Sequence, residues 1–303
     1  MITKLAKTVA QTQTPSESTP PHLNERSWLE YQEVTANELC SNLSLELKRI
    51  AKKASAKHVH DTRVALRRWD SVWNVLERDG WHTDAFAKKI GRHLKKLRKL
   101  LGQLRDWDVN IEVGTTLGVP DELLNKWSQE RDKAEKHIRS GLKKMKVGKL
   151  PKRMRKFIKV RPYELRREIA QVKLRMLAES AYAHLEPYLK EQEELTRQAE
   201  KAAHDWQTMH RLRLCIKGWR YLLTEFFGLT NLELVKAQQL LGKYNDISRI
   251  SRLLSEDEAT KVLAKDVLRK IESQSDLLMK EFTELRKTLP YGLRPALISH
   301  YGV

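Results

Sequence analysis

The sequence predicts an all-α protein. From Glu25 onward, apolar residues recur at three- and four-residue spacing, which places them on one face of a helix. No stretch alternates apolar and polar residues over five or more positions, as a half-buried strand would. Glycine and proline, which most often interrupt helices, number only 12 and 9 among 303 residues.

The N-terminal part of the chain supports three helices. Residues 1–23 are rich in Thr, Gln, Ser and Pro and predict a disordered tail, so the helical domain is expected over 24–303. Apolar stripes cover 28–50 and 64–76, and Thr83 can cap a third helix. That helix has apolar residues at the spacing of an antiparallel-bundle seam: Phe86, Ile90, Leu94, Leu97, Leu101 and Leu104.

The rest of the chain continues the helical pattern. Further apolar stripes run through 121–146, 163–200, 205–227, 232–243 and 256–289. Pro187 lies inside one of them and is expected to kink or break that helix. Segment 139–162 contains two glycines and two prolines. We therefore expect a basic linker there, between a first half of about 24–147 and a second half of about 160–290.

Composition argues against several classes of protein. The chain contains no run of about 18 apolar residues, so no membrane-spanning helix is predicted. The N-terminal residues lack the apolar stretch of a secretory signal. Cys40 and Cys215 lie far apart, so neither a disulfide framework nor a cysteine-rich metal site is expected. Together these features favour a cytoplasmic protein.

The charge departs most from that of an average protein. Lys and Arg number 58 against 39 Asp and Glu, which gives a net charge of +19. The excess is concentrated in segments 48–69, 88–105 and 139–175, whereas 176–200 is acidic. Because such an excess repels itself, it predicts an anionic partner: nucleic acid, a phosphorylated polymer or anionic lipid.

Two motifs occur twice in the chain. The His-x-x-Arg run that begins at His60 recurs at His210 with an offset of 150 residues. The Leu-Leu-Gly run that contains Gly102 recurs around Gly242 with an offset of 140 residues. Two copies of the same pair of motifs predict an internal repeat, with two bundles in a pseudo-two-fold arrangement.

Helical geometry turns these motifs into rows of positive charge, which we call basic rails. The three rails are His60, Arg63 and Arg67; His210, Arg213, Lys217 and Arg220; and Lys88, Arg92, Lys95 and Lys99. Like charges at such spacing destabilise a helix by about 0.2–0.5 kcal/mol per pair. Three basic rails in one chain therefore indicate an anionic ligand that relieves the repulsion.

The motifs resemble those of the CHAD family, the conserved histidine α-helical domain. Four runs carry the resemblance: His-Asp-x-Arg-x-x-x-Arg-Arg at 60–68, Leu-Gly-x-Leu-Arg-Asp-x-Asp-Val at 101–109, His-x-x-Arg-x-x-x-Lys-x-x-Arg-Tyr at 210–221, and Leu-Gly-x-x-Asn-Asp at 241–246. The resemblance spans about residues 25–290. It implies two helical bundles around a basic central pore, and binding of inorganic polyphosphate, often at polyphosphate granules.

The resemblance and the third rail together suggest a set of candidate polyphosphate-binding residues. The set is His60, Arg63, Arg67, Arg68, Arg92, Lys95, Lys99, Arg105, His210, Arg213, Lys217 and Arg220. The second copy departs from the first at Gly218, where Arg68 would repeat. It also has Val235 and Gln239 where the first copy has Lys95 and Lys99. The pore is therefore expected to be more basic on one side.

Several alternatives remain open at this stage. His60 and His210 either contact the anion or orient the arginines beside them. A nucleic-acid-binding protein, above all an RNA-binding one, is the main rival, although the rails carry no aromatic residues for base stacking. Neither catalysis nor a metal site is expected, because Asp106 and Asp108 alone, or His58 and His60 on different helix faces, do not close a metal site. No cofactor and no membrane partner are expected, and the oligomeric state is open.

Overall fold

The computed structural model describes residues 28–81, 85–172 and 181–293. The predicted tail, 1–23, and the predicted cap Thr83 lie outside these residues. All regular structure within them is helical, which confirms the all-α prediction. No helix in the described ranges has the length and apolar character needed to cross a membrane.

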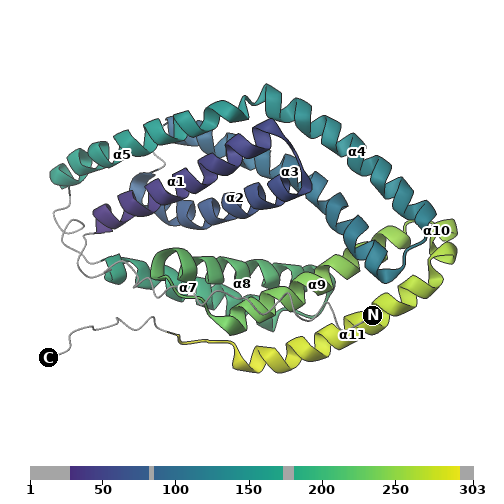
Figure 1. The fold of residues 1–303 in the computed structure, drawn as a ribbon. Helices are drawn as coiled ribbons and strands as arrows, with labels where there is room; N and C mark the ends of the chain where they lie inside the picture. The colour runs from purple at the N-terminus through teal and green to yellow at the C-terminus, as the bar shows by residue number, and fades with distance from the viewer. Residues whose placement is uncertain (1–27, 82–84, 173–180, 294–303) are drawn as a thin grey trace, which may run out of the picture.

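The first half of the chain forms five long helices (Figure 1). They are α1 (Trp28–Lys52), α2 (Ala56–Leu76), α3 (Ala85–Leu117), α4 (Asp121–Lys144) and α5 (Leu150–Val172). A π-helical turn, Glu77–Trp81, follows α2, and a 3-10 turn, Val147–Lys149, precedes α5. In this half, α1 packs against both α2 and α5, and α3 packs along α4.

The second half forms a similar stack. Its helices are α7 (Ala181–Lys201), α8 (Trp206–Phe227), α9 (Leu232–Leu254), α10 (Glu258–Leu263) and α11 (Lys265–Leu285), with a final 3-10 turn, Arg286–Thr288. Here α8 packs between α7 and α9, and α11 returns along α9. The internal repeat and its pseudo-two-fold arrangement stay predictions.

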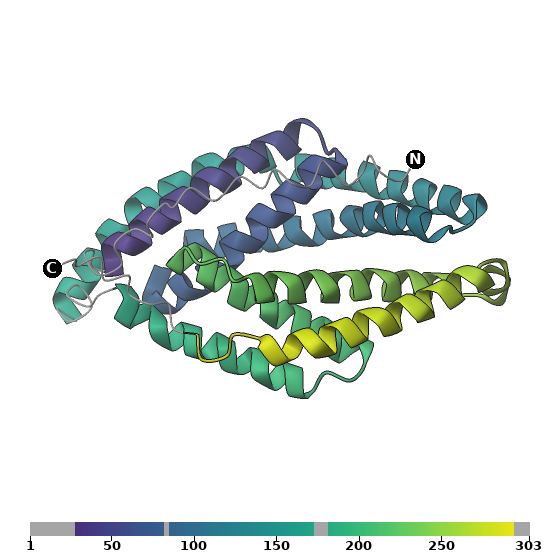
Figure 2. The same ribbon diagram turned by 60° about the horizontal axis from the view of Figure 1, so that its bottom comes forward.

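The two halves meet along α2 with α8 and along α3 with α9. The main hydrophobic core contains Trp69 and Trp219, which are both buried. A second core contains Trp127 of α4 and Ile250 of α9. It lies where the α3–α4 hairpin meets the α9–α11 hairpin, and Figure 2 shows these two hairpins side by side. The interface between the halves is therefore anchored at both ends of α3 and α9.

The predicted linker over 139–162 is wrong. Most of this segment belongs to α4 and α5, and α5 packs on α1 through Met154, Phe157 and Ile158, which are all buried. Pro151 lies in the first turn of α5, where its missing N–H is not needed by the helix. The first half thus extends through α5.

Pro187 does not break its helix either. Helix α7 continues through it to Lys201. Leu185 and Leu189, on either side of the proline, are both fully buried. Their packing supplies the stability that the lost backbone hydrogen bond would have given.

Candidate polyanion-binding site

Helices α2 and α8 carry the first two basic rails to the interface between the halves. Each helix begins with a side-chain cap: the Ser55 hydroxyl accepts a hydrogen bond from the His58 N–H, and the Asp205 carboxylate accepts one from the Thr208 N–H. Each cap lies five residues before the histidine of its rail. The two rails therefore start at equivalent turns of their helices.

The arginine of each rail passes over a glycine of the neighbouring helix. A Cβ added at Gly102 would lie 3.1 Å from Nη1 of Arg63, and that Nη1 donates to the Arg98 carbonyl at 3.4 Å. In the second copy, a Cβ at Gly242 would lie 3.8 Å from Nε of Arg213. Both arginines also have a buried Nε with no partner among the described residues. The Leu-Leu-Gly motifs thus make room for two guanidinium groups.

Six cations from four helices converge at this interface. We call them the basic cluster: Arg63 and Arg67 from α2, Arg105 from α3, Arg213 and Lys217 from α8, and Arg249 from α9. Burial, followed by the charge of Arg67, lowers the pKa of Arg63 to about 10. Arg67 also acts across the interface, on Arg213 and Lys217. Arg63 likewise acts on Lys217, so the charges of the two rails are close enough to influence one another.

Lys217 is the most perturbed member of the basic cluster. Its side chain lies on the inner face of α8, and the residue is only 8% exposed. Burial lowers its pKa to about 6, with further lowering by Arg213 and Arg67. Burial likewise lowers the pKa of Arg213, and the charge of Asp246 only partly opposes this. Both shifts show positive charge held where the protein supplies too little compensating negative charge.

Two aspartates, one from each half, provide the nearest negative charge, and Arg249 connects them. Its Nη1 lies 3.1 Å from Asp106 Oδ1 and its Nη2 lies 3.7 Å from Asp246 Oδ1. Its Nε also donates to Asn110 Oδ1 at 2.7 Å, so one side chain of α9 binds two residues of α3. Asp106 and Asp246 are therefore arginine partners in this structure. Sequence analysis missed Arg249, although its position four residues after Asn245 on the same helix face was a usable signal.

The two histidines sit beside equivalent positions of the Leu-Gly motifs. His210 Nδ1 lies 2.7 Å from Asn245 Oδ1, and this bond fixes the ring. Partial burial, followed by the charge of Arg105, lowers the pKa of His60. Arg105 and Asn245 occupy matching places in the two motifs. When Nδ1 of His210 donates to Asn245, Nε2 can donate to an anion only if the ring is protonated.

Two predicted site residues, Arg68 and Arg220, bind partners outside the basic cluster. Arg68 Nε lies 2.9 Å from Glu225 Oε1 of α8, outside the basic cluster. Arg220 Nε donates to Gln238 Oε1 at 2.9 Å, and its guanidinium lies 4.4 Å from the ring centre of Tyr221. Both arginines therefore support the packing of α8 in this structure.

The third rail lies exposed along α3. Arg92, Lys95 and Lys99 are all exposed, and no described residue forms an ion pair with any of them. Lys95 and Lys99 stand seven residues before Gly102 and Asp106, so each pair shares one face of the helix. This rail therefore extends the face of α3 that meets the basic cluster. Its role in binding stays a prediction.

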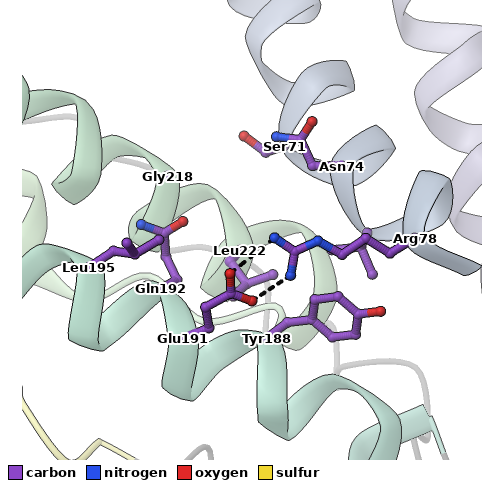
Figure 3. A pocket seen from close by; sticks show the side chains of 10 residues that line it. Ser71, Asn74, Arg78, Tyr188, Glu191, Gln192, Leu195, Gly218 and Leu222 are labelled. Atoms are coloured by element: carbon purple, nitrogen blue, oxygen red, sulfur yellow. Dashed lines mark hydrogen bonds and ion pairs between the residues drawn. The ribbon is translucent and has the colours of Figure 1, made fainter.

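A small polar pocket lies beyond the basic cluster, between α2, α7 and α8 (Figure 3). Its volume is about 110 Å³. Arg78 and Glu191 form a two-pronged ion pair at its edge, which joins the two halves. A Cβ at Gly218, which lines the pocket, would lie 3.0 Å from Gln192 Oε1. A side chain at position 218, where the first copy has Arg68, would therefore require Gln192 to move.

The alternative metal sites do not come together. Asp106 points to α9, whereas Asp108 accepts a hydrogen bond from Arg131 of α4 at 3.0 Å. His58 Nδ1 lies 2.8 Å from the Lys53 carbonyl, so its ring is held against its own helix start. Within the described ranges, these side chains therefore act as structural partners.

Comparison with known proteins agrees with this fold. Residues 37–255 match the model of the CHAD domain family. The structure resembles the crystal structure of the CHAD domain from the plant Ricinus communis, with 17% identity, a TM-score of 0.64, and coverage of 89% of this chain and 95% of that one. It also resembles PptA from Streptomyces chartreusis, with 13% identity, a TM-score of 0.59, and coverage of 86% and 100%. At these identities the likeness concerns the fold, and no curated protein sequence matches.

Proposed function

We propose that this protein, which belongs to the CHAD domain family, binds a phosphate polyanion, above all inorganic polyphosphate, at the basic cluster. The observation that carries the proposal is the convergence of Arg63, Arg67, Arg213 and Lys217 from both halves. The association of the family with polyphosphate or triphosphate binding supports the same ligand.

The physical argument rests on unpaired positive charge. In the free protein these cations repel one another, and partial burial weakens their hydration. A phosphate chain would supply a row of oxygens that guanidinium groups bind in forks and that an ammonium binds as a point charge. Binding would therefore relieve repulsion that the protein's own aspartates only partly offset.

Two aromatic residues of α8, Trp206 and Tyr221, favour a polymer without bases. Trp206 stacks with His210, and the guanidinium of Arg252 lies 3.8 Å from the Trp206 ring centre. Tyr221 is buried and covered by Arg220. Single-strand nucleic-acid binders need free rings on which bases can stack. These two rings are already used inside the protein, so phosphate contacts alone would have to supply the affinity.

We infer binding without catalysis, because the two aspartates beside the basic cluster are held by Arg249. For the cellular setting we propose the cytoplasm, including the surface of polyphosphate granules. The proposed setting rests on the resemblance to the CHAD family, and the absence of catalysis rests on the ion pairs of the two aspartates.

The decisive experiment compares long-chain polyphosphate with single-stranded RNA of equal charge at fixed salt. A cluster variant carries four changes to methionine: Arg63→Met, Arg67→Met, Arg213→Met and Lys217→Met. A control variant loses the same charge by changing four exposed, ion-paired lysines to glutamine: Lys126, Lys133, Lys261 and Lys287. Circular dichroism checks that both remain helical.

We expect the wild type to prefer polyphosphate. The cluster variant should bind at least about tenfold more weakly and show a flatter salt dependence, because fewer counterions are released. The control variant should stay close to the wild type. Equal affinity for RNA would support the nucleic-acid alternative, and an equal loss in the control variant would show diffuse binding without a defined site.

A further inference from the structure

A second basic surface lies on the outside of the first half. From Lys136 to Tyr163 the sequence contains twelve Lys and Arg and no Asp or Glu. Ten of these cations are exposed, and we call the eight that follow Leu142 the outer basic face: Lys143, Lys144, Lys146, Lys149, Lys152, Arg155, Lys156 and Lys159. They follow the end of α4, the 3-10 turn and the first half of α5.

The cations of this face lack the ion pairs that several other exposed lysines form. Those lysines pair with an acid one turn away: Lys126 with Glu122, Lys133 with Glu130, Lys190 with Glu186, Lys261 with Glu258, and Lys287 with Glu284. None of the eight cations of the outer basic face has an ion-pair partner among the described residues. The usual arrangement of a solvated helix surface is thus missing here.

The cations on α5 form a single stripe. Lys152, Arg155, Lys156 and Lys159 follow i, i+3, i+4, i+7 spacing, opposite the buried Met154 and the residues packed beside it. Each member is one turn from at least two others of the same charge. An ordinary surface helix would intersperse acids to avoid this repulsion, so the stripe is suited to an external polyanion.

The outer basic face is separate from the basic cluster. In the first half, α5 packs on α1 and α1 packs on α2, whereas α8 contacts α2 from the second half. In Figure 1, α1 and α2 lie between α5 and α8. A bound chain that occupies the interface of the halves therefore leaves the outer basic face free.

We propose that the outer basic face is a second binding surface for the same phosphate polymer, and that the protein cross-links polyphosphate chains. This inference rests on the function proposed above. A protein with one site would bind along a long chain without linking it to another chain. Two separate sites on one molecule can join two chains or two parts of one chain. Long chains should then gather the protein into a condensed network.

The test uses an outer-face variant: Lys152→Gln, Arg155→Gln, Lys156→Gln and Lys159→Gln. All four side chains are exposed, so the fold should be retained. The control variant defined above loses the same positive charge from ordinary surface. Light scattering after addition of long-chain polyphosphate measures cross-linking, and titration with tripolyphosphate, which is too short to join two sites, measures binding itself.

We expect solutions of the wild type and of the control variant to scatter light strongly. The scattering should fall again at excess polymer, when each binding site carries its own chain and no chain is shared between molecules. The outer-face variant should scatter at least about fivefold less while its tripolyphosphate affinity changes by less than about threefold. Undiminished scattering by this variant, or an equal decrease in the control variant, would overturn the cross-linking proposal alone. If the wild type bound neither long-chain polyphosphate nor tripolyphosphate, the proposed function itself would be wrong.

Discussion

Replacing Lys217 with methionine should remove most of the pH dependence of polyphosphate binding. Lys217 is 8% exposed, and burial together with the charges of Arg213 and Arg67 lowers its pKa to about 6. Just above neutral pH, the amine of the free protein is therefore mostly uncharged. A bound phosphate chain brings negative charge close to it, which favours the ammonium form and raises the pKa.

The sign and size of the effect follow from proton linkage. The bound state holds more protons than the free state, so affinity rises as pH falls. If the pKa in the complex exceeds about 8, each unit of pH between about 6 and 8 changes the dissociation constant by up to about tenfold, or about 1.4 kcal/mol. Below about pH 6 the dependence levels off, because Lys217 is protonated in both states.

Fluorescence anisotropy with labelled long-chain polyphosphate, at constant ionic strength, measures this dependence. Long chains are used because their terminal phosphates, which titrate near neutral pH, are few. Calorimetry in two buffers of different ionisation enthalpy counts the protons taken up. Lys217→Met should bind with a nearly flat pH profile, whereas Lys217→Arg should bind tightly and also show a flat profile, because arginine stays charged.

A second variant separates Lys217 from the other group that titrates in this range. Partial burial and Arg105 lower the pKa of His60, so His60→Gln should remove only a contribution at the acid end of the profile. The reasoning is refuted if Lys217→Met retains the wild-type slope, since Lys217 would then hold its proton in the free protein or lie away from the polymer.

Three further predictions follow from the geometry. Gly102→Ala should weaken polyphosphate binding by about 1 kcal/mol, because its Cβ would lie 3.1 Å from Nη1 of Arg63. Gly242→Ala serves as the control: its Cβ would lie 3.8 Å from Nε of Arg213, so it should bind like the wild type in the same titration. Arg249→Met should lower the free energy of unfolding in urea by about 1–3 kcal/mol, because it leaves the buried Asn110 without its partner; an unchanged midpoint would contradict this. Polyphosphate should raise the melting temperature of the wild type more than that of the cluster variant, as differential scanning fluorimetry can show.

The fold was largely predictable because apolar spacing is a local signal. The prediction failed at α5, for which the sequence indicated a linker although Met154, Phe157 and Ile158 follow helical spacing. Dense Lys and Arg and two prolines hid that stripe in the sequence. Whether a basic, proline-containing segment is a linker or a packed helix depends on a neighbour, here α1, more than one hundred residues earlier.

The site was predictable only where the repeat supplied it. Arg63 and Arg213 stand at matching places, and the structure puts each over the matching glycine. Arg249 was missed because its contacts with α3 join residues 139 and 143 positions apart. Arg68 was included by its motif, yet it pairs with Glu225 because the tertiary arrangement places that carboxylate within reach. Motif spacing predicts the helix face, and only packing decides which neighbour that face meets.

The composition of the two basic surfaces indicates different tasks. Five of the six cations in the basic cluster are arginine, whereas seven of the eight in the outer basic face are lysine. Arginine is weakly hydrated and keeps its charge when half-buried, so it suits a site where phosphates are held between helices. Lysine is strongly hydrated and flexible, so it suits contacts that form and break along an exposed polymer. Lys217 shows the consequence of placing a lysine in the first environment. Because its pKa is about 6, it is the cation of the basic cluster whose charge a bound polyanion would change.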